Sequence, residues 1–565
     1  MIKKKLAVAL SIALLSIGPV EAAKYRVVEL DVANVGEDSF PSAINDDGEM
    51  SVNVASPYNV PIDLDLLDFD SIALNALLTD PAAASFGNIN EVDYELLLGF
   101  IRDQSGSQLS QQIASLISYQ ASEDETNYIP VFDQEASEDG DYTFSSNVTT
   151  RDINNSDFTA GSSQGYYFKV DYQLDDGEDV TFVVNEFGRR GFVSRNGVTT
   201  ELPPPEDFAG GFSEAYGLNN SNQVVGFGTT EFLTDSFELA EENCEDEDLR
   251  GDVPYESCIS SLAATLTSNL TDASQLRGLI WELDDEGNLL DTTELGILFE
   301  PEAEDTSGYT SRAVAINDNG IAVGVSNGEY TNAQGTVIRN YGVIFNGDEI
   351  INLTPNPEEL VALSTVNIST ATDINNNNLV VGYHAQRVNG FTRDKFFVYD
   401  MSLGELESPD DFFAGSRSVA LAVNNNNLVV GFGEVDAAIN GRRSEGFLYD
   451  HNTQEFNRIG DLIDCDSIYT IVQANAINDN DEIAATALYL QPARDSRGEL
   501  ILDSGGNEIL VDKIAAVKLV PIEGGEIETC EVPIEEIARP RQGASLGWLI
   551  MFSGLLLLWR RVVKR

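Results

Sequence analysis

Residues 372–382 read Thr-Asp-Ile-Asn-Asn-Asn-Asn-Leu-Val-Val-Gly, and residues 421–431 repeat the pattern as Leu-Ala-Val-Asn-Asn-Asn-Asn-Leu-Val-Val-Gly. Asparagine tolerates positive φ angles and its side chain caps tight turns, whereas the flanking apolar residues are typical of β-strands. A short Asn-rich segment between two such strands predicts a hairpin. Each stretch is therefore expected to form two strands joined by a turn.

The same pattern occurs seven times along the chain. The first turn asparagines of the seven copies are Asn45, Asn154, Asn219, Asn317, Asn375, Asn424 and Asn478. A second hairpin with an aromatic-rich first strand alternates with the first, as at Gly342-Val-Ile-Phe and Gly446-Phe-Leu-Tyr. Two hairpins give four strands in roughly 50–60 residues, which is the length of a β-propeller blade.

The two ends of the β region carry complementary half-units. Residues 25–31 resemble the last strand of the second hairpin, and residues 514–520 resemble its first strand. Pairing of these two strands would close a ring and remove the open sheet edge. We therefore predict an all-β fold, a seven-bladed β-propeller spanning residues 23–535. An open β-solenoid or stacked β-sandwiches are the alternative, in which the complementary ends would be a coincidence.

Two intervals between repeats are long and contain predicted insertions. Residues 61–120 are predicted to be helical, because Leu109, Ile113, Leu116 and Ile117 follow the helical period. This insertion is one candidate docking site for a partner, and packing on the side of the propeller is the simpler interpretation.

The second insertion, residues 232–275, is predicted to be a disulfide-closed loop. Cys244 and Cys258 lie in it, next to an acidic run, and are expected to pair. Cys465 and Cys530 then pair by elimination. Disulfides are typical of an oxidising compartment, and the absence of any C-x-x-C motif argues against a zinc ribbon or a thioredoxin-like site.

The N-terminus is typical of a secretory signal. Lys3, Lys4 and Lys5 precede an apolar run, and small residues suit cleavage after Ala22 or Ala23. We interpret residues 1–22 as a signal peptide and expect the protein to be exported across an inner membrane.

The C-terminus predicts a membrane-directed helix. Residues 536–545 are interpreted as a linker, and residues 546–565 as an apolar run, LGWLIMFSGLLLLW, with a basic end. Fourteen apolar residues span about 21 Å as a helix, less than the roughly 30 Å of a bilayer core. The segment resembles the GlyGly-CTERM sorting tails of Gram-negative exported proteins, which a rhombosortase-type protease removes.

The Gly-Gly pair of those tails is replaced here by Gln542-Gly543-Ala544, so a permanent single-pass anchor is the alternative. In either case we expect at least transient membrane contact. The final location is periplasmic, cell-surface or secreted.

The repeat A-x-x-I-N-x-x-G-x-V-V-G, followed by an aromatic-rich hairpin, resembles the HAF-type extracellular repeat. Together with the signal and the tail, it makes the chain similar to a domain-of-unknown-function family of exported gamma-proteobacterial proteins. The resemblance covers most of the chain and implies the repeat architecture. It brings no catalytic residues with it.

Charge and composition narrow the function classes. A formal net charge of −62 would be repelled by nucleic acid, so no nucleic-acid partner is expected. Histidine occurs only as His384 and His451, neither in a motif that supports a catalytic triad or a zinc site. No cofactor is expected. Calcium at the acidic turns 45–49 and 478–482, or at the acidic run 241–248, is the alternative, but a turn role explains all seven repeats.

The sequence therefore favours a non-catalytic repeat protein that binds a protein or glycan partner. The alternative is an extracellular hydrolase that uses Asp or Glu side chains of the central channel. Two carboxylates about 5–10 Å apart in a concave pocket would favour the hydrolase, whereas a channel lined only by apolar and Asn side chains would favour binding.

Overall fold

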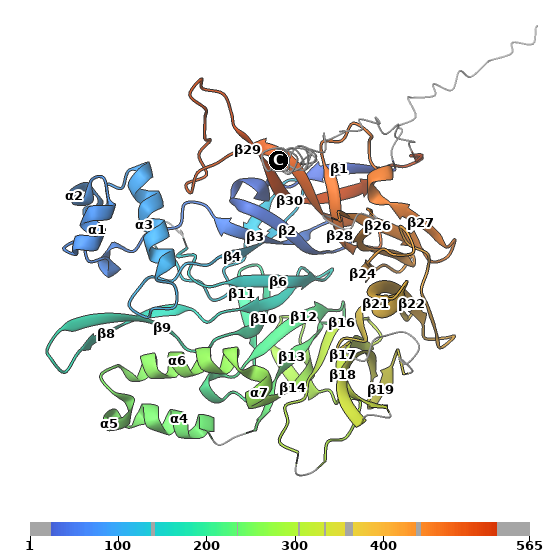
Figure 1. Ribbon diagram of the computed structural model, residues 1–565, viewed down its shortest axis with the longest axis horizontal. Helices are drawn as coiled ribbons and strands as arrows, with labels where there is room; N and C mark the ends of the chain where they lie inside the picture. Colours follow the sequence, from blue (N-terminus) through green and yellow to red (C-terminus); the bar gives the residue numbers. More distant parts are fainter. Residues whose placement is uncertain are drawn as a thin grey trace, which may run out of the picture. The chain divides into compact units, whose positions relative to one another are not determined.

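The structure is a computed structural model that describes residues 24–136, 142–233, 236–302, 305–332, 335–355, 365–436 and 442–527. These residues form seven four-stranded antiparallel sheets and one separate two-stranded sheet. The first strands of successive sheets contact one another, and the first strand of the last sheet contacts that of the first sheet. The fold is therefore a closed seven-bladed β-propeller, as predicted (Figure 1).

The first three blades carry the large insertions, and their strands run from the inside of the ring outward. Blade 1 contains β2 (Gly36–Ile44), β3 (Met50–Pro57), β4 (Leu116–Ala121) and β5 (Thr126–Tyr128). Blade 2 contains β6 (Val148–Ile153), β7 (Thr159–Ser163), β10 (Arg190–Arg195) and β11 (Val198–Leu202). Blade 3 contains β12 (Ser213–Leu218), β13 (Gln223–Phe232), β14 (Ser274–Leu283) and β15 (Leu289–Glu294).

The remaining blades follow the same order. Blade 4 contains β16 (Ser311–Ile316), β17 (Ala322–Asn332), β18 (Gly335–Asn346) and β19 (Glu349–Asn352). Blade 5 contains β20 (Ser369–Ile374), β21 (Leu379–Val388), β22 (Phe391–Asp400) and β23 (Glu405–Glu407). Blade 6 contains β24 (Ser418–Val423), β25 (Leu428–Glu434), β26 (Ser444–Asp450) and β27 (Glu455–Arg458). Blade 7 contains β28 (Thr470–Ile477), β29 (Ile483–Pro492), β30 (Leu510–Pro521) and β1 (Tyr25–Glu29).

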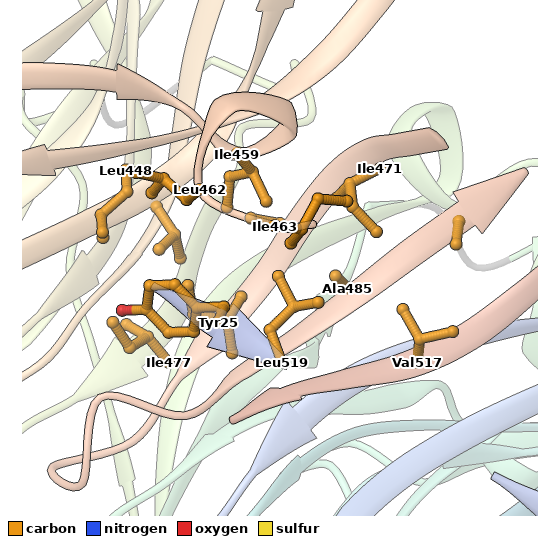
Figure 2. Packing of buried hydrophobic residues seen from close by; sticks show 14 of the residues in the cluster. Tyr25, Leu448, Ile459, Leu462, Ile463, Ile471, Ile477, Ala485, Val517 and Leu519 are labelled. Carbon is orange, nitrogen blue, oxygen red and sulfur yellow. The ribbon is translucent and has the colours of Figure 1, made fainter. Parts of the chain in front are cut away.

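The predicted closure by the terminal strands is confirmed. β1 pairs antiparallel with β30, in a register that runs from Tyr25 opposite Pro521 to Glu29 opposite Val517. Figure 2 shows the Tyr25 ring among side chains of blades 6 and 7, including Leu448 and Leu519. Burial of this apolar surface stabilises the junction that a linear chain must close to make a ring.

The glycine of the Val-Val-Gly motif has a packing reason. Every innermost strand contains a β-bulge shortly before its turn asparagine, as between Ala371 and Asp373 in blade 5. The bulged strand lies close to its neighbour, and a Cβ atom at Gly382 would overlap the Thr370 carbonyl oxygen. Glycine therefore allows the close approach of the two inner strands.

The two faces of the ring carry different connections between the strands. All seven Asn turns join the first and second strands of the blades, so they share one face, which we call the Asn face. The connections between second and third strands lie on the opposite face, which we call the insertion face. Both ends of the described propeller lie at the Asn face, where the Ile522 N–H donates to the Lys24 carbonyl at 2.8 Å.

The first insertion is only partly as predicted. It contains helices α1 (Ile72–Leu77), α2 (Pro81–Ala84) and α3 (Glu91–Asp103). The helical assignment of Leu109, Ile113, Leu116 and Ile117 is wrong, because residues 109–115 are irregular and Leu116–Ala121 form β4. A spacing of four residues also keeps side chains on one face of a strand. Pairing of Ile117 with Val54 in β3 decided the outcome.

The second insertion contains the predicted Cys244–Cys258 disulfide, with a Cα–Cα distance of 5.6 Å. Its interpretation as a loop is wrong, because the segment contains four helices. These are α4 (Ser236–Glu245), α5 (Glu247–Arg250), α6 (Tyr255–Ser268) and α7 (Leu270–Ala273). The disulfide joins α4 to α6, and α6 buries Leu262, Ala263 and Leu266.

A third insertion was not predicted. β8 (Tyr167–Gln173) and β9 (Asp179–Asn185) form a separate hairpin between the second and third strands of blade 2. The hairpin contacts α6 of the neighbouring insertion. Short 3₁₀ segments occupy connections elsewhere, at Asp31–Asn34, Leu64–Leu66, Phe208–Gly210 and Ile459–Asp461.

The predicted signal peptide, linker, tail and Cys530 lie outside the described residues, so the Cys465–Cys530 pairing stays a prediction. In the described part of the chain, no helix has both the length and the apolar character needed to cross a membrane.

Candidate functional site

The seven turn asparagines form a closed ring of hydrogen bonds at the Asn face. Each side-chain Nδ2 donates to the backbone oxygen of the matching asparagine in the next blade, over 2.8–3.3 Å, and Asn478 closes the ring on Asn45. Each side-chain oxygen accepts from its own turn, as when Asn375 Oδ1 accepts from the Leu379 N–H at 2.9 Å. These residues therefore cap their turns and join the blades.

A second ring lies one residue further along each turn. The side-chain oxygen of each of its members accepts the backbone N–H of the matching residue in the preceding blade, over 2.8–3.0 Å. The members are Asp46, Asn155, Asn220, Asp318, Asn376, Asn425 and Asp479. The acidic turns that suggested calcium thus use these oxygens to join blades. Among the described residues, no group of three or more His, Cys, Asp or Glu side chains is arranged to hold a metal ion.

Two aspartates line the channel behind these rings, on strands of blades 2 and 5. Asp152 accepts from the Leu218 N–H of the next blade at 2.7 Å, and Asp373 accepts from the Val423 N–H at 2.7 Å. Each also accepts from the N–H of the residue that follows it, at 2.8 Å. The channel is therefore not lined only by apolar and Asn side chains.

Burial raises the pKa of both channel aspartates to about 7, against the opposing effect of the two backbone hydrogen bonds on each. The charge of Asp152 raises the pKa of Asp373 further. The sequence interpretation missed this pair. The sequence does contain a signal for the pair. The residue two positions before the turn asparagine is aspartate in these two repeats, and alanine or glycine in the other five. That the two residues share a channel follows only from closure of the ring.

The two histidines lie apart from this pair. His384 Nε2 lies 2.7 Å from the Ser408 hydroxyl, but its Nδ1 is buried without a partner. Burial lowers the pKa of His384 to about 4. A serine–histidine nucleophile needs a group that orients the imidazole through Nδ1, and this pair has none. His451 follows β26 in a turn.

The insertions of blades 1, 2 and 3 lie on the same side of the ring (Figure 1). Three adjoining cavities lie on the insertion face. The first is lined mainly by the insertion of blade 1, the second also by the insertion of blade 2, and the third also by the insertions of blades 2 and 3. Their volumes are about 630, 700 and 460 Å³. Pro61, Ile62 and Leu64 line both the first and the second cavity. Gln112, Tyr167 and Val183 line both the second and the third. We call this set of adjoining cavities the insertion groove.

The groove combines aromatic rings with uncharged polar groups. The first cavity is lined by Tyr58, Tyr94, Tyr119 and Tyr142. The second cavity mixes apolar side chains with glutamine and charged ones, whereas the third is lined largely by glutamine, serine and threonine side chains. Of the charged side chains in the second cavity, Lys169 pairs with Asp63 at 2.5 Å, whereas Asp65 is exposed. Such a mixture suits binding better than proton transfer.

A seven-bladed β-propeller with a hydrogen-bonded Asn face and a groove on its insertion face is the class of protein that this fold and site define. The chain belongs to the family described as "Protein of unknown function (DUF3466)", whose model matches residues 3–562. The prediction that the chain belongs to a domain-of-unknown-function family is thus confirmed. The HAF-type repeat, the sorting tail and the gamma-proteobacterial range stay predictions.

The comparison with solved structures finds distant similarities. The propeller domain of the Trilobed protease from Pyrococcus furiosus is 11% identical over 58% of this chain and 74% of its own, with a TM-score of 0.26. A puromycin-hydrolyzing peptidase from Mycobacterium tuberculosis is 8% identical over 84% of this chain and 62% of its own, with a TM-score of 0.24. A search of curated proteins finds no match. At these TM-scores the likenesses carry no argument about function.

Proposed function

We propose that this protein is an exported, non-catalytic β-propeller that binds a protein or glycan partner in the insertion groove. The observation that carries the proposal is that three cavities adjoin one another and share lining residues. Each is of a size that buries a ligand or a chain segment. They are built from insertions that closure of the ring does not require, and recognition is commonly placed on such segments.

Export and membrane contact are part of the same proposal. The signal-like residues 1–22 would direct translocation, and residues 546–565 would hold the protein at a membrane at least until processing. Mass measurement of the native C-terminus tests the tail. A mass ending near residue 545 supports removal, and a mass that includes Arg565 supports a permanent anchor.

A pair of tryptophan variants on α6 tests the groove. Ala264 is exposed on α6 and lines the third cavity, whereas Ser268 is exposed on the same helix outside it. The purified full-length protein is screened against arrayed glycans and candidate envelope proteins. We expect Ala264→Trp to abolish binding of a ligand that the native protein retains, and Ser268→Trp to leave it unchanged. Equal binding by the two variants, or no ligand in either class, contradicts the proposal.

A hydrolase that uses the channel aspartates is the second candidate, favoured by one observation. Paired-carboxylate hydrolysis needs one protonated and one ionised carboxyl group at the working pH, and Asp152 and Asp373 both have pKa values near 7. Against it, the channel cavity is only about 180 Å³, below the usual size of a ligand pocket. Release of reducing ends from polysaccharides that disappears in Asp373→Asn would establish this candidate over the first.

A further inference from the structure

An ordered arm on the insertion face is formed by the connection between β29 and β30 together with the adjoining ends of these strands. We define the arm as residues 488–511. Ala493 donates to the Ile509 carbonyl at 2.7 Å and accepts from the Ile501 N–H at 2.9 Å. Two tight turns follow, closed by Gly498 to Asp495 at 2.9 Å and by Gly506 to Asp503 at 3.0 Å. The backbone of the arm is therefore held by its own hydrogen bonds.

The arm exposes a set of apolar side chains. Leu490 is 59% exposed, Leu502 52% and Leu510 56%. The whole set of exposed aliphatic residues comprises Leu488, Leu490, Leu500, Ile501, Leu502, Ile509, Leu510 and Val511. Apolar side chains gathered on one ordered surface element mark an interaction site, whereas single ones are ordinary.

The arm is fastened to the helical insertion of blade 1. The Arg497 guanidinium lies 4.0 Å from the Tyr94 ring centroid and donates to the Ile89 carbonyl at 3.2 Å. The Asn59 N–H donates to the Ser496 carbonyl at 2.9 Å. The insertion itself exposes Ile72 and Phe86, which are 89% and 84% exposed. Two neighbouring segments thus both present apolar side chains to solvent.

The negative charge of the arm and the helical insertion limits which kind of partner can bind them. Residues 58–115 contain nine acidic residues and one basic residue, and the arm adds Asp495, Glu499, Asp503 and Glu508. Its two arginines are engaged, because Arg494 donates to the Gly498 carbonyl at 2.6 Å and Arg497 contacts the insertion. A second copy carries the same −62 charge and is repelled. An anionic lipid surface is repelled for the same reason.

We infer that the arm and the helical insertion dock a partner protein whose contact surface is apolar at its centre and rich in Lys and Arg at its rim. This inference goes beyond the insertion groove, because it adds a second binding surface for a cationic protein. Apolar burial supplies the affinity of such an interface. The acidic rim supplies attraction at a distance and a dependence on salt.

Two exposed leucines of the arm provide the test. Leu500→Ser/Leu502→Ser removes apolar surface without changing charge or core packing, and Leu403→Ser is a matched control because Leu403 is 67% exposed on blade 5. The probes are synthetic 18-residue amphipathic peptides, one of leucine and lysine and one of leucine and glutamate. Vesicles of phosphatidylcholine are the third probe. Binding is measured by fluorescence anisotropy with the full-length protein at low and high salt.

We expect the leucine–lysine peptide to bind the native protein and the control, and to lose about tenfold in affinity in the double variant. The leucine–glutamate peptide should not bind. Equal affinity in the native protein and the double variant would show binding by charge alone and overturn the inference. Vesicle binding, or self-association by light scattering, that is lost in the double variant would assign the arm to lipid or to a second copy instead.

The experiments distinguish failure of the groove proposal from failure of the arm proposal. Loss of ligand in Ala264→Trp together with an unaffected Leu500→Ser/Leu502→Ser variant keeps the groove and removes the docking arm. An effect of the leucine variants alone keeps the arm and removes the groove.

Discussion

Replacement of Asn375 by aspartate separates the two tasks of a turn asparagine. Asn375 is buried, at 4% exposure. Its Oδ1 accepts from the Asn377 and Leu379 N–H groups at 3.0 and 2.9 Å, which caps its own turn. Its Nδ2 donates to the Asn424 carbonyl at 2.8 Å and to Asn427 Oδ1 at 2.9 Å, both in the next blade. Aspartate keeps the acceptor and loses the donor.

The expected loss follows from these contacts. A buried carbonyl left without its donor costs about 1–3 kcal/mol, and a carboxylate placed opposite it adds repulsion, so we expect Asn375→Asp to destabilise the fold by about 3 kcal/mol. With an unfolding entropy near 2.1 cal/mol/K per residue over about 500 residues, 3 kcal/mol lowers Tm by about 3 °C. Asn375→Ala also loses the two turn bonds, which gives a total of about 5 kcal/mol.

Differential scanning calorimetry at pH 7.5 and pH 4 measures the effect. Asn389→Asp is the control, because Asn389 is exposed in the β21–β22 hairpin of the same blade and has positive φ. We expect this control to melt with the native protein. At pH 4 the carboxyl group introduced by Asn375→Asp is protonated and regains a donor, so the loss of stability in this variant should shrink. A native-like Tm for Asn375→Asp at pH 7.5 would refute the joining of blades by these side chains.

Three further predictions concern closure, titration and the disulfide. Tyr25→Ala should destabilise the ring by about 3–5 kcal/mol, because a buried aromatic side chain is lost at the terminal strand. Amide hydrogen exchange in β30 should become faster. An unchanged exchange rate would contradict closure of the ring by β1. Asp373 has a folded-state pKa of about 7 against about 3.9 unfolded. Protonated Asp373 therefore stabilises the fold below about pH 4, and the free energy of unfolding falls by up to about 4 kcal/mol as the pH rises to about 7. In a series of denaturant titrations, Asp373→Asn should flatten this decline. A native slope in this variant would show that the carboxyl does not titrate there. Cys258→Ser should destabilise the second insertion by about 3 kcal/mol. Limited proteolysis should then cleave within residues 236–273, whereas the Tm of the propeller should not change. A global loss of structure would show that the insertion and the ring do not unfold separately.

The blades were predictable because their signals are local. An Asn-rich turn between apolar strands is determined by side-chain capping and permitted φ angles within a few residues. The glycine that five of the seven repeats carry follows from the same bulged hairpin. Seven copies with complementary ends then leave ring closure as the simplest way to remove an open edge. The residue types of the insertions carry no such repeated signal.

The insertions show where local reasoning failed. Ile113 and Ile117 satisfy a helical spacing and a strand spacing equally well. Only the availability of β3 as a pairing partner placed Ile117 in a strand. The segment that carries Cys244 and Cys258 is predicted as a disulfide-closed loop, because its acidic residues obscure a weak apolar pattern. This pattern forms a stable helix only when α6 buries Leu262 and Leu266.

The sequence by itself determined the number of repeats, their hairpin geometry and the joining of the two chain ends, because each depends on contacts within a repeat or on one pairing at the ends. The tertiary structure alone decided which side chains meet. The ring brings Asp152 and Asp373 into one channel although 220 residues separate them in the sequence, and it places the three insertions beside one another to form the groove. Such contacts depend on the curvature of the whole ring, which no single segment encodes.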